Sequence, residues 1–359
     1  MLSIINWTPI VYGWLVFMLL FFTGGMATRM EMGYIGIQER TKPMYAFLVF
    51  LPIFIFVVFG IPRYDTYAYL SIFEYSVPSD FSQASTYLAT EDEKGFAVFN
   101  VLVKMFFGNN TTAYRFLIAL VHTIPVVLVL RRYSENYLLS IYVFLALSFH
   151  KAWMMNGLRQ FMAVCIIFAA TPWIVERKYL RCFLVVLLAT TFHRSAIVML
   201  PVVYLASKEA WSKLTLLFLI GISIATVVFA RSSDSFDVVA GTAGYSLEAV
   251  REIGDDGMNP IRLLVFAVPT ILAFRAREEL KKEGDPLINV CVNMSILTVG
   301  ISAVAVVTSG ILTGRMPIYT NLYNLILLPC VLRVNFRNQN KTIVMISAIV
   351  LYYIYSLFE

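Results

Sequence analysis

Residues 180–206 read LRCFLVVLLATTFHRSAIVMLPVVYLA, two apolar stretches separated by the polar segment 190–195. As one helix, this segment would measure about 40 Å and would cross a bilayer. As two halves that meet at the polar segment, each half would reach only about 20 Å. The second arrangement is a re-entrant hairpin, whose polar tip must be buried in protein or line a cavity. The alternative is a long tilted span in which His193 is a satisfied core histidine.

Composition places the chain among helical membrane proteins. Of its 359 residues, 59% are hydrophobic and only 14% are charged, and the mean hydropathy is +0.76. A soluble domain carries more charge, and continuous apolar runs exclude a membrane β-barrel. The net charge of +6 is ordinary for cytoplasmic loops and gives no reason to expect nucleic acid. We expect an all-α, polytopic chain with about ten transmembrane helices, at 9–23, 43–60, 114–130, 138–150, 161–175, 214–230, 260–276, 287–309, 317–332 and 342–358.

Charge favours the hairpin over the single span. With 180–206 re-entrant, every main basic cluster falls on the cytoplasmic side, where positive charge normally gathers. A full crossing would instead place the clusters at 275–282 and 333–341 outside. We therefore predict one transmembrane domain, 1–359, with two outer loops. Loop 61–113 contains an amphipathic helix at 95–107 that is suited to the outer leaflet, and loop 231–259 is a candidate lid.

Ten cations then lie at the outer ends of the apolar segments. A charge near the bilayer is costly there unless it pairs with a polar or anionic group. This pattern predicts an anionic, lipid-borne substrate at the outer mouth of the bundle. The ten are Arg63, Lys94, Lys104, Arg115, Lys151, Arg159, Arg231, Arg251, Arg262 and Arg315.

The segments around Arg159 and His193 contain the clearest candidates for catalytic or binding residues. Arg159 opens an apolar run, and a guanidinium at a helix N-terminus suits phosphate or pyrophosphate; a snorkelling interfacial arginine is the alternative. His193 lies at the expected hairpin tip, where a histidine acts as a general base, hydrogen-bonds a sugar hydroxyl, or simply packs against a backbone carbonyl. Neither segment decides the function alone.

Two further segments face the same side. Asp65, next to Arg63, is one of few acids near the outer interface, and it either orients or deprotonates a hydroxyl or forms a local ion pair. Arg315 lies between Gly314 and Pro317, in a turn into a helix start that again favours anions. The topology sends Arg63, Arg159, His193 and Arg315 to one face.

Taken together, these segments resemble the EpsG/Wzy group of bacterial polysaccharide polymerases. The resemblance rests on four pieces, Arg63-Tyr64-Asp65-Thr66-Tyr67, Gly157-Leu158-Arg159-Gln160-Phe161-Met162-Ala163, Ala189-Thr190-Thr191-Phe192-His193-Arg194-Ser195-Ala196 and Gly314-Arg315-Met316-Pro317-Ile318-Tyr319. Their order spans most of the chain, and the third piece is the most distinctive.

The resemblance implies a glycosyltransferase of GT-C-like fold that polymerises undecaprenyl-pyrophosphate-linked oligosaccharide repeat units at the outer face of the bacterial cytoplasmic (inner) membrane. It implies no metal or other cofactor, and a flippase and a chain-length regulator as partners beside the lipid bilayer. Arginines would then stabilise the leaving pyrophosphate: Arg159 and Arg315, with Arg63 assisting. His193 is the first choice of base and Asp65 the second, with inversion at the anomeric carbon. Further substrate contacts are expected from Arg194, Gln160, Tyr319, Tyr67 and Arg115.

Three other functions remain open at this point. A ligase would hand the same glycan to a different acceptor, and a flippase or transporter would move the lipid-linked sugar unchanged. A transporter typically shows two related halves and broken helices at mid-depth, and no convincing internal repeat is present. An acyltransferase would need a histidine with a nearby acid in a membrane cavity.

Overall fold

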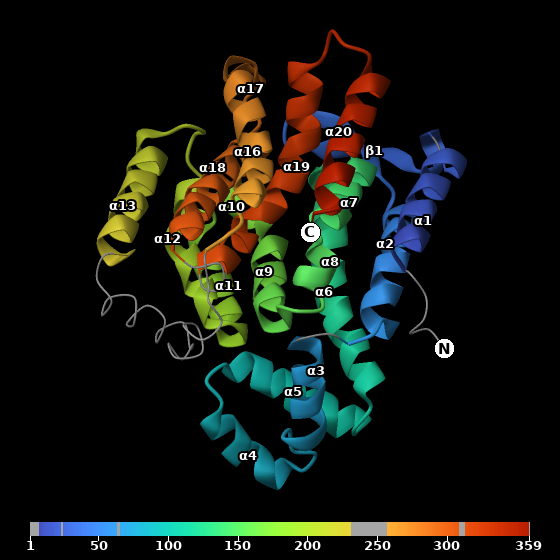
Figure 1. Ribbon diagram of the computed structural model, residues 1–359, viewed down its shortest axis with the longest axis vertical. Helices are drawn as coiled ribbons and strands as arrows, with labels where there is room; N and C mark the ends of the chain where they lie inside the picture. The colour runs from blue at the N-terminus through green and yellow to red at the C-terminus, as the bar shows by residue number, and fades with distance from the viewer. Residues whose placement is uncertain (1–6, 23, 63–64, 231–256, 309–312, 359) are drawn as a thin grey trace. The chain divides into compact units, whose positions relative to one another are not determined.

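The computed structural model describes residues 7–22, 24–62, 65–230, 257–308 and 313–358 (Figure 1). These residues form two compact units. Unit 1 consists of Met1–Thr171, Phe183–Ile197 and Gln339–Glu359, and unit 2 of Pro172–Cys182 and Val198–Asn338, each within the described residues. The expected single transmembrane domain therefore stays a prediction, and the candidate lid at 231–259 falls almost wholly outside the described residues.

Unit 1 is built around α6, which packs against α2 and α9. Asn110 starts α6, since its side chain accepts a hydrogen bond from the Ala113 N–H at 3.0 Å, as expected of an N-cap. The elements of this unit are α1 (Trp7–Phe21), η2 (Gly24–Met26), β1 (Thr28–Gly33), β2 (Gly36–Thr41), α2 (Pro43–Phe59), α3 (Asp65–Tyr75), α4 (Phe81–Thr90), α5 (Lys94–Phe107), α6 (Thr111–Tyr133), α7 (Tyr137–Ala146), α8 (Phe149–Ala152), α9 (Leu158–Ala169) and α20 (Lys341–Ser356).

Unit 2 is built around α18, which packs against α12, α13, α16 and α19. Asp285 caps α18 by accepting from the Leu287 N–H at 2.8 Å, and Pro286 occupies its first turn, a position that proline favours. The elements are α10 (Thr171–Val175), α12 (Met199–Ala206), α13 (Lys213–Ala230), α16 (Pro260–Arg275), α17 (Arg277–Glu283), α18 (Pro286–Val307), η4 (Thr313–Arg315) and α19 (Ile318–Asn335).

Residues 180–206 form two helices rather than one. α11 (Tyr179–Phe192) ends before His193, η3 (Arg194–Val198) follows, and α12 begins at Met199. The two outer ends of the segment meet, because the Tyr179 hydroxyl lies 3.0 Å from Ser207 Oγ and the Tyr179 ring lies 5.3 Å from that of Tyr204. The chain therefore turns back at the polar segment, and the single long helix is excluded. That the hairpin is re-entrant in a bilayer stays a prediction.

Among the described residues, two helices are long and apolar enough to cross a bilayer, α6 and α18. All the expected spans overlap helices, but most of these helices are shorter than a membrane-crossing helix needs to be. The expected span 138–150 is broken between α7 and α8, where Ser148 adopts a left-handed conformation with φ of 54°. The structure is thus mostly helical, with two helices of membrane length, and the larger number of spans stays a prediction.

The sequence predicts an all-α chain, but β1 and β2 form a two-stranded antiparallel sheet. The physical reason is a period of two: Arg29 and Glu31 alternate with Met30 and Met32, and alternation of this kind favours a strand. Gly36 has φ of +116° at the turn, a conformation that glycine adopts readily.

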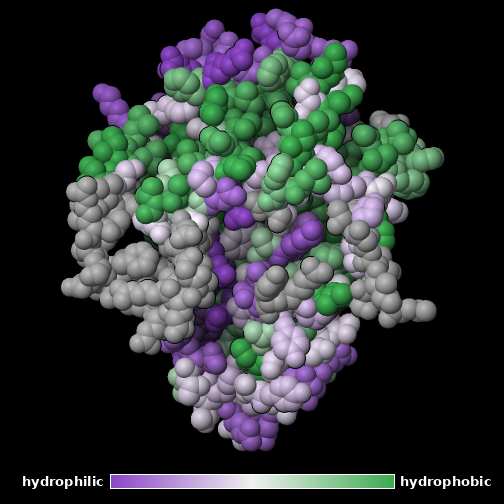
Figure 2. Space-filling model, viewed as in Figure 1, coloured by the Kyte–Doolittle hydropathy of each residue, from purple (hydrophilic) through white to green (hydrophobic). Residues whose placement is uncertain are grey.

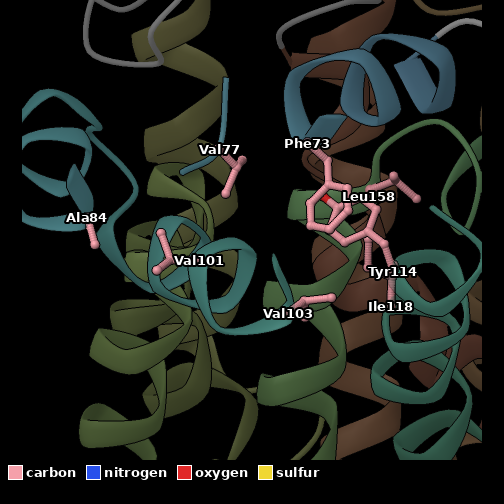
Figure 3. Packing of buried hydrophobic residues seen from close by; sticks show 8 residues of the cluster. All are labelled: Phe73, Val77, Ala84, Val101, Val103, Tyr114, Ile118 and Leu158. Atoms are coloured by element: carbon pink, nitrogen blue, oxygen red, sulfur yellow. The ribbon is translucent and has the colours of Figure 1, made fainter. Parts of the chain in front are cut away.

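Helices α3, α4 and α5 form a small module at the end of unit 1 where α6 begins (Figure 1). Its core includes Phe73 stacked on Tyr114 with ring centroids 4.1 Å apart, together with Val101 and Leu158 (Figure 3). The surface over this module is mainly white and purple in Figure 2, so hydrophilic and intermediate residues predominate there. The helix expected at 95–107 is α5, whose contact with the outer leaflet stays a prediction.

Candidate functional site

The candidate site is centred on Glu93, a residue that the sequence alone does not mark as a candidate. Glu93 precedes α5 and its side chain is only 8% exposed. Instead of capping its own helix, the carboxylate reaches the tip of the α11–α12 hairpin. Oε1 lies 2.7 Å from His193 Nδ1 and accepts a hydrogen bond from the Arg194 backbone N–H at 3.1 Å. One carboxylate thus fixes both the imidazole and the start of η3.

Arg159 approaches the same carboxylate from the first turn of α9. Its Nη1 lies 2.8 Å from Glu93 Oε2, and its Nε donates to the Tyr69 hydroxyl at 2.9 Å. The guanidinium also lies over the rings of Tyr69 and Phe96, at 5.3 and 5.8 Å from their centroids, where cation–π attraction adds to the ion pair. We call Tyr69, Glu93, Arg159 and His193 the Glu93 cluster.

Electrostatics keep Glu93 ionised. Burial acts to raise the pKa of this carboxyl, but the hydrogen bond from His193 and the charges of His193 and Arg159 outweigh it, so the pKa lies below its ordinary value. Oε2 makes no hydrogen bond, so its contact with Arg159 is chiefly charge attraction. Burial, the largest influence, raises the pKa of Tyr69, which keeps this phenol a neutral donor and acceptor.

The side chains of Thr191 and Phe192 pack closely against α5 at Gly95. A Cβ atom on Gly95 would lie 2.2 Å from Thr191 Oγ1 and 3.1 Å from Phe192 Cδ2. Real Cβ atoms do not approach so closely, so only glycine fits without a shift at this position. The absence of a side chain at Gly95 is what lets Glu93, two residues earlier, reach His193.

The start of α3 is tied to the residues that precede α9. The Asp65 backbone N–H donates to Asn156 Oδ1 at 3.1 Å, and the Thr66 hydroxyl donates to the Met155 carbonyl. Asp65 is half-buried, and its charge acts on Tyr69, one helical turn further along. The structure thus brings Asp65, Arg159 and His193 to one end of unit 1, and their roles in a site stay predictions.

The remaining predicted contacts of unit 1 lie in different surroundings. Arg115 Nη2 donates to the carbonyls of Val57 and Gly60, at 2.6 and 2.7 Å, and so binds the end of α2. Gln160 is buried and Tyr67 is 71% exposed. Arg194 forms an ion pair with Asp92, whose side chain is 72% exposed. Their roles as substrate contacts stay predictions.

Arg315 and Tyr319 belong to unit 2, in η4 and at the start of α19. The two units are not placed relative to each other, so the expected meeting of Arg315 with Arg159 stays a prediction. Arg63 lies outside the described residues. Among the described residues, no group of three or more His, Cys, Asp or Glu side chains is arranged to hold a metal ion; a metal-independent reaction stays a prediction.

The fold and the cluster together define a class. This is a mostly helical protein with helices of membrane length, in which a buried glutamate joins an imidazole and a guanidinium at a helix break. Residues 44–359 match the EpsG family, and the chain belongs to that family, which is linked to exopolysaccharide biosynthesis. No curated protein and no solved structure matches the chain.

Proposed function

We propose that this protein is a membrane glycosyltransferase that polymerises undecaprenyl-pyrophosphate-linked repeat units at the outer face of the bacterial cytoplasmic membrane. Family membership supports a role in making exopolysaccharide. The observation that carries the proposal is the hydrogen bond of 2.7 Å between Glu93 and His193 Nδ1, with Arg159 beside it. It supplies a general base and a cation in one small region.

His193 is the proposed base. When Nδ1–H donates to Glu93, the other nitrogen, Nε2, carries the lone pair, and the imidazole is held in one tautomer. Nε2 has no hydrogen-bond partner among the described residues. It is therefore available to accept the proton of an acceptor hydroxyl, and the Glu93 carboxylate stabilises the imidazolium that forms. Glu93 is a positioning residue in this scheme, and Asp65 is the alternative base.

Arg159 is the proposed binder of the leaving group. The acceptor oxygen forms a bond to the anomeric carbon as the bond from that carbon to pyrophosphate breaks, and His193 takes the hydroxyl proton. The electron pair leaves with the lipid pyrophosphate, whose growing charge needs cationic stabilisation. Because Glu93 already neutralises part of the Arg159 charge, we propose that Arg315 and Arg63 also bind the diphosphate. A single displacement inverts the anomeric configuration.

The proposed topology has about ten spans, with the α3–α5 module and the hairpin tip on the outer side. Two helices of membrane length and the family support a membrane location. The end of unit 1 that carries the Glu93 cluster is also the end where α6 begins. This arrangement suits a lipid-linked substrate, whose sugar lies above the bilayer while its tail stays within it.

The deciding experiment is reconstitution of the purified protein in vesicles with one lipid-linked repeat unit. A polymerase converts this single substrate into a ladder of longer glycans. A ligase gives product only after a second acceptor is added, and a flippase moves the glycan without lengthening it. Single repeats alone, with the protein folded and inserted, would contradict the proposal. Retained configuration at the new linkage would contradict the single displacement.

A further inference from the structure

The β1–β2 hairpin has two chemically different faces. Met30, Met32 and Ile37 share one face, since Met32 pairs with Ile37 and strand residues two apart point the same way. They are 65%, 75% and 67% exposed. Ile35, in the turn between the strands, is 49% exposed. Glu39 lies on this face directly opposite Met30, and its carboxylate accepts a hydrogen bond from the Thr28 hydroxyl at 2.5 Å, at the end of the face nearest the protein.

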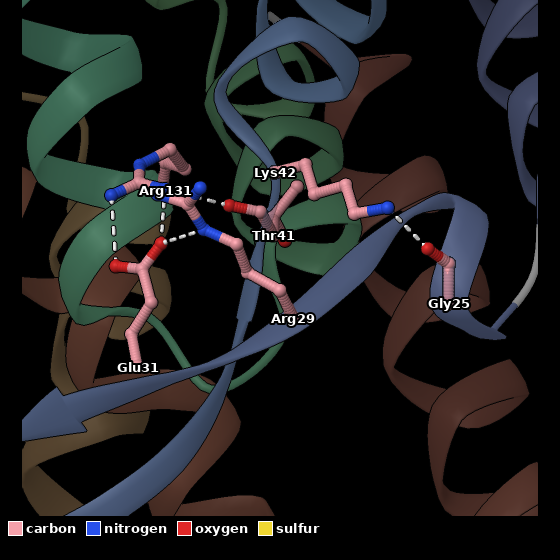
Figure 4. Close-up of polar contacts among 6 residues, drawn as sticks. All are labelled: Gly25, Arg29, Glu31, Thr41, Lys42 and Arg131. Carbon is pink, nitrogen blue, oxygen red and sulfur yellow. Dashed lines mark hydrogen bonds and ion pairs between the residues drawn. The ribbon is translucent and has the colours of Figure 1, made fainter.

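The opposite face is polar and attached to the protein (Figure 4). Arg131, in the last turn of α6, makes two contacts with the Glu31 carboxylate at 2.8 and 3.0 Å and donates to the Thr41 carbonyl at 3.0 Å. Arg40, which is buried, donates to the Ser134 carbonyl at 2.8 Å. The hairpin is therefore held in place by its charged side chains.

The hairpin is oriented opposite to a sheet on the surface of a soluble protein. An antiparallel sheet that covers a protein in water normally packs its apolar face inward and turns its polar face outward. Here the polar face packs inward and three large apolar side chains point away from the protein. A contiguous exposed apolar surface of this kind marks contact with a membrane or another protein.

The hairpin's neighbours indicate a bilayer. The hairpin connects the end of α1 to the start of α2, and the exposed apolar side chains continue onto both helices: Leu20 and Phe21 are 66% and 65% exposed, and Met44 is 73% exposed. α6 has 23 residues and so measures about 34 Å, close to the thickness of a hydrocarbon core. The hairpin lies at its last turn, at the end opposite the α3–α5 module.

The charges around the hairpin favour anionic lipids. Cations outnumber carboxylates in the hairpin and the adjoining end of α6. Arg29 is half exposed and Arg132 is exposed. Basic residues at the edge of an apolar face attract anionic head groups. The cations are Arg29, Arg40, Lys42, Arg131 and Arg132, and the carboxylates are Glu31, Glu39 and Glu135. Arg40 and Arg131 are buried and hold the hairpin in place, so the cations left to meet head groups are Arg29, Lys42 and Arg132.

We propose that the β1–β2 hairpin is an amphipathic membrane-surface element. Its Met30–Met32–Ile37 face lies in the acyl boundary of the leaflet opposite the Glu93 cluster, and its flanking cations bind anionic lipid head groups. The hairpin thereby fixes the depth of α6 in the bilayer, because Arg131 links Glu31 directly to the end of that helix. This assignment does not depend on the proposed glycosyltransferase activity.

The test uses a fluorescent label at single cysteines in proteoliposomes. The native cysteines Cys165, Cys182, Cys291 and Cys330 are buried, which favours selective labelling of a new exposed one. An NBD label is placed at Met32→Cys, at Leu20→Cys as the lipid-facing reference, and at Glu279→Cys on the exposed face of α17 as the aqueous reference. Vesicles contain phosphatidylcholine with or without phosphatidylglycerol, and a doxyl-labelled lipid serves as the quencher.

We expect the Met32→Cys label to be quenched at least about twofold more than the Glu279→Cys label, and more strongly with phosphatidylglycerol than without it. Quenching equal to that of the Glu279→Cys label would overturn the proposal. Equal quenching in the two lipid mixtures would overturn the anionic part of it. A label that is open to water in vesicles but protected in native membranes would indicate a protein partner instead, and Met30→Cys provides a second position if Met32→Cys does not fold.

Discussion

Glu93 and His193 are 100 residues apart in the chain, yet Glu93 Oε1 lies 2.7 Å from His193 Nδ1. The contact joins the start of α5 to the break between α11 and η3. A buried carboxylate in this position does two things at once: it orients the imidazole, and it balances the charge of the half-buried Arg159 guanidinium.

Replacement of this carboxylate is expected to affect catalysis more than substrate binding. Glu93→Gln preserves size but removes the charge that stabilises the imidazolium, so we predict that kcat falls by about 10²-fold or more while KM changes little. The measurement is ladder formation in proteoliposomes. Asp92→Asn is the matched control, because the Asp92 side chain is 72% exposed and exposed pairs contribute little. A normal kcat in Glu93→Gln would remove Glu93 from the site.

The two basic members of the cluster are expected to be individually essential. Arg159→Ala and His193→Ala should abolish the ladder while the protein stays in the membrane. Arg159→Lys retains a cation near Glu93 but loses the fork that also reaches Tyr69, so we predict a partial loss that appears mainly in KM. The measurement is the rate of chain extension at several concentrations of lipid-linked repeat. Normal chain length in both alanine variants would show that the cluster only holds the helices together.

The contact at Gly95 gives a structural test of how the cluster is assembled. In Gly95→Ala the new methyl group meets Thr191 Oγ1 at 2.2 Å and Thr191 Cβ at 3.0 Å, so the Thr191 side chain must rotate and α5 must still shift slightly from the hairpin tip. We predict a loss of about 1–3 kcal/mol in stability and a large loss of activity. Thr191→Ala should restore part of both in the double variant, because the two changes act at one contact. The measurement is the melting temperature together with ladder formation, and simple additivity would contradict the packing argument.

The turn at residues 190–195 could be predicted from sequence, because it depends on the local order of polar and apolar residues and on the distribution of charge along the whole chain. A polar segment between two apolar halves, and the distribution of Arg and Lys among the loops, both favour a hairpin. Arg159 and His193 stand out in the sequence because polar and charged groups near a bilayer are costly. Polar and apolar residues also alternate at 28–33. This alternation predicts a strand in the segment before α2.

Glu93 and Arg115 show why other parts of the site could not be predicted. Glu93 ends the run Glu91-Asp92-Glu93, and a run of acids normally lies in water. Only the fold shows that the third acid is buried while the second, Asp92, is exposed. Arg115 donates to two backbone carbonyls at the end of α2, contacts that its local sequence does not indicate. Such pairings depend on which helices pack together.

A further prediction concerns the stability of the α3–α5 module. Lys104 is 4% exposed, and its Nζ donates to the carbonyls of Phe73 and Glu74 at 2.7 and 2.8 Å, at the end of α3. Lys104→Ala leaves the buried Phe73 carbonyl and the partly buried Glu74 carbonyl without this donor, which costs about 1–3 kcal/mol. We expect a lower melting temperature in detergent. Lys94→Ala is the control, since the Lys94 contacts are exposed; an equal shift in both variants would contradict the assignment.

The ion pair between Glu31 and Arg131, which attaches the β1–β2 hairpin to α6, is expected to lose its contribution to stability at acid pH. Hydrogen bonding from Arg131 is the largest influence on Glu31 and lowers the pKa of this carboxyl from 4.5 to about 2. A carboxylate with a lowered pKa stabilises the folded protein fully above the unfolded pKa, and this contribution disappears as pH falls through the folded pKa. The melting temperatures of the native protein and of Glu31→Gln should therefore differ most above pH 5. The difference should shrink steadily as the pH is lowered to 4 and then to 3. A difference that is constant over this range, or absent at neutral pH, would show that the Glu31–Arg131 pair does not hold the hairpin.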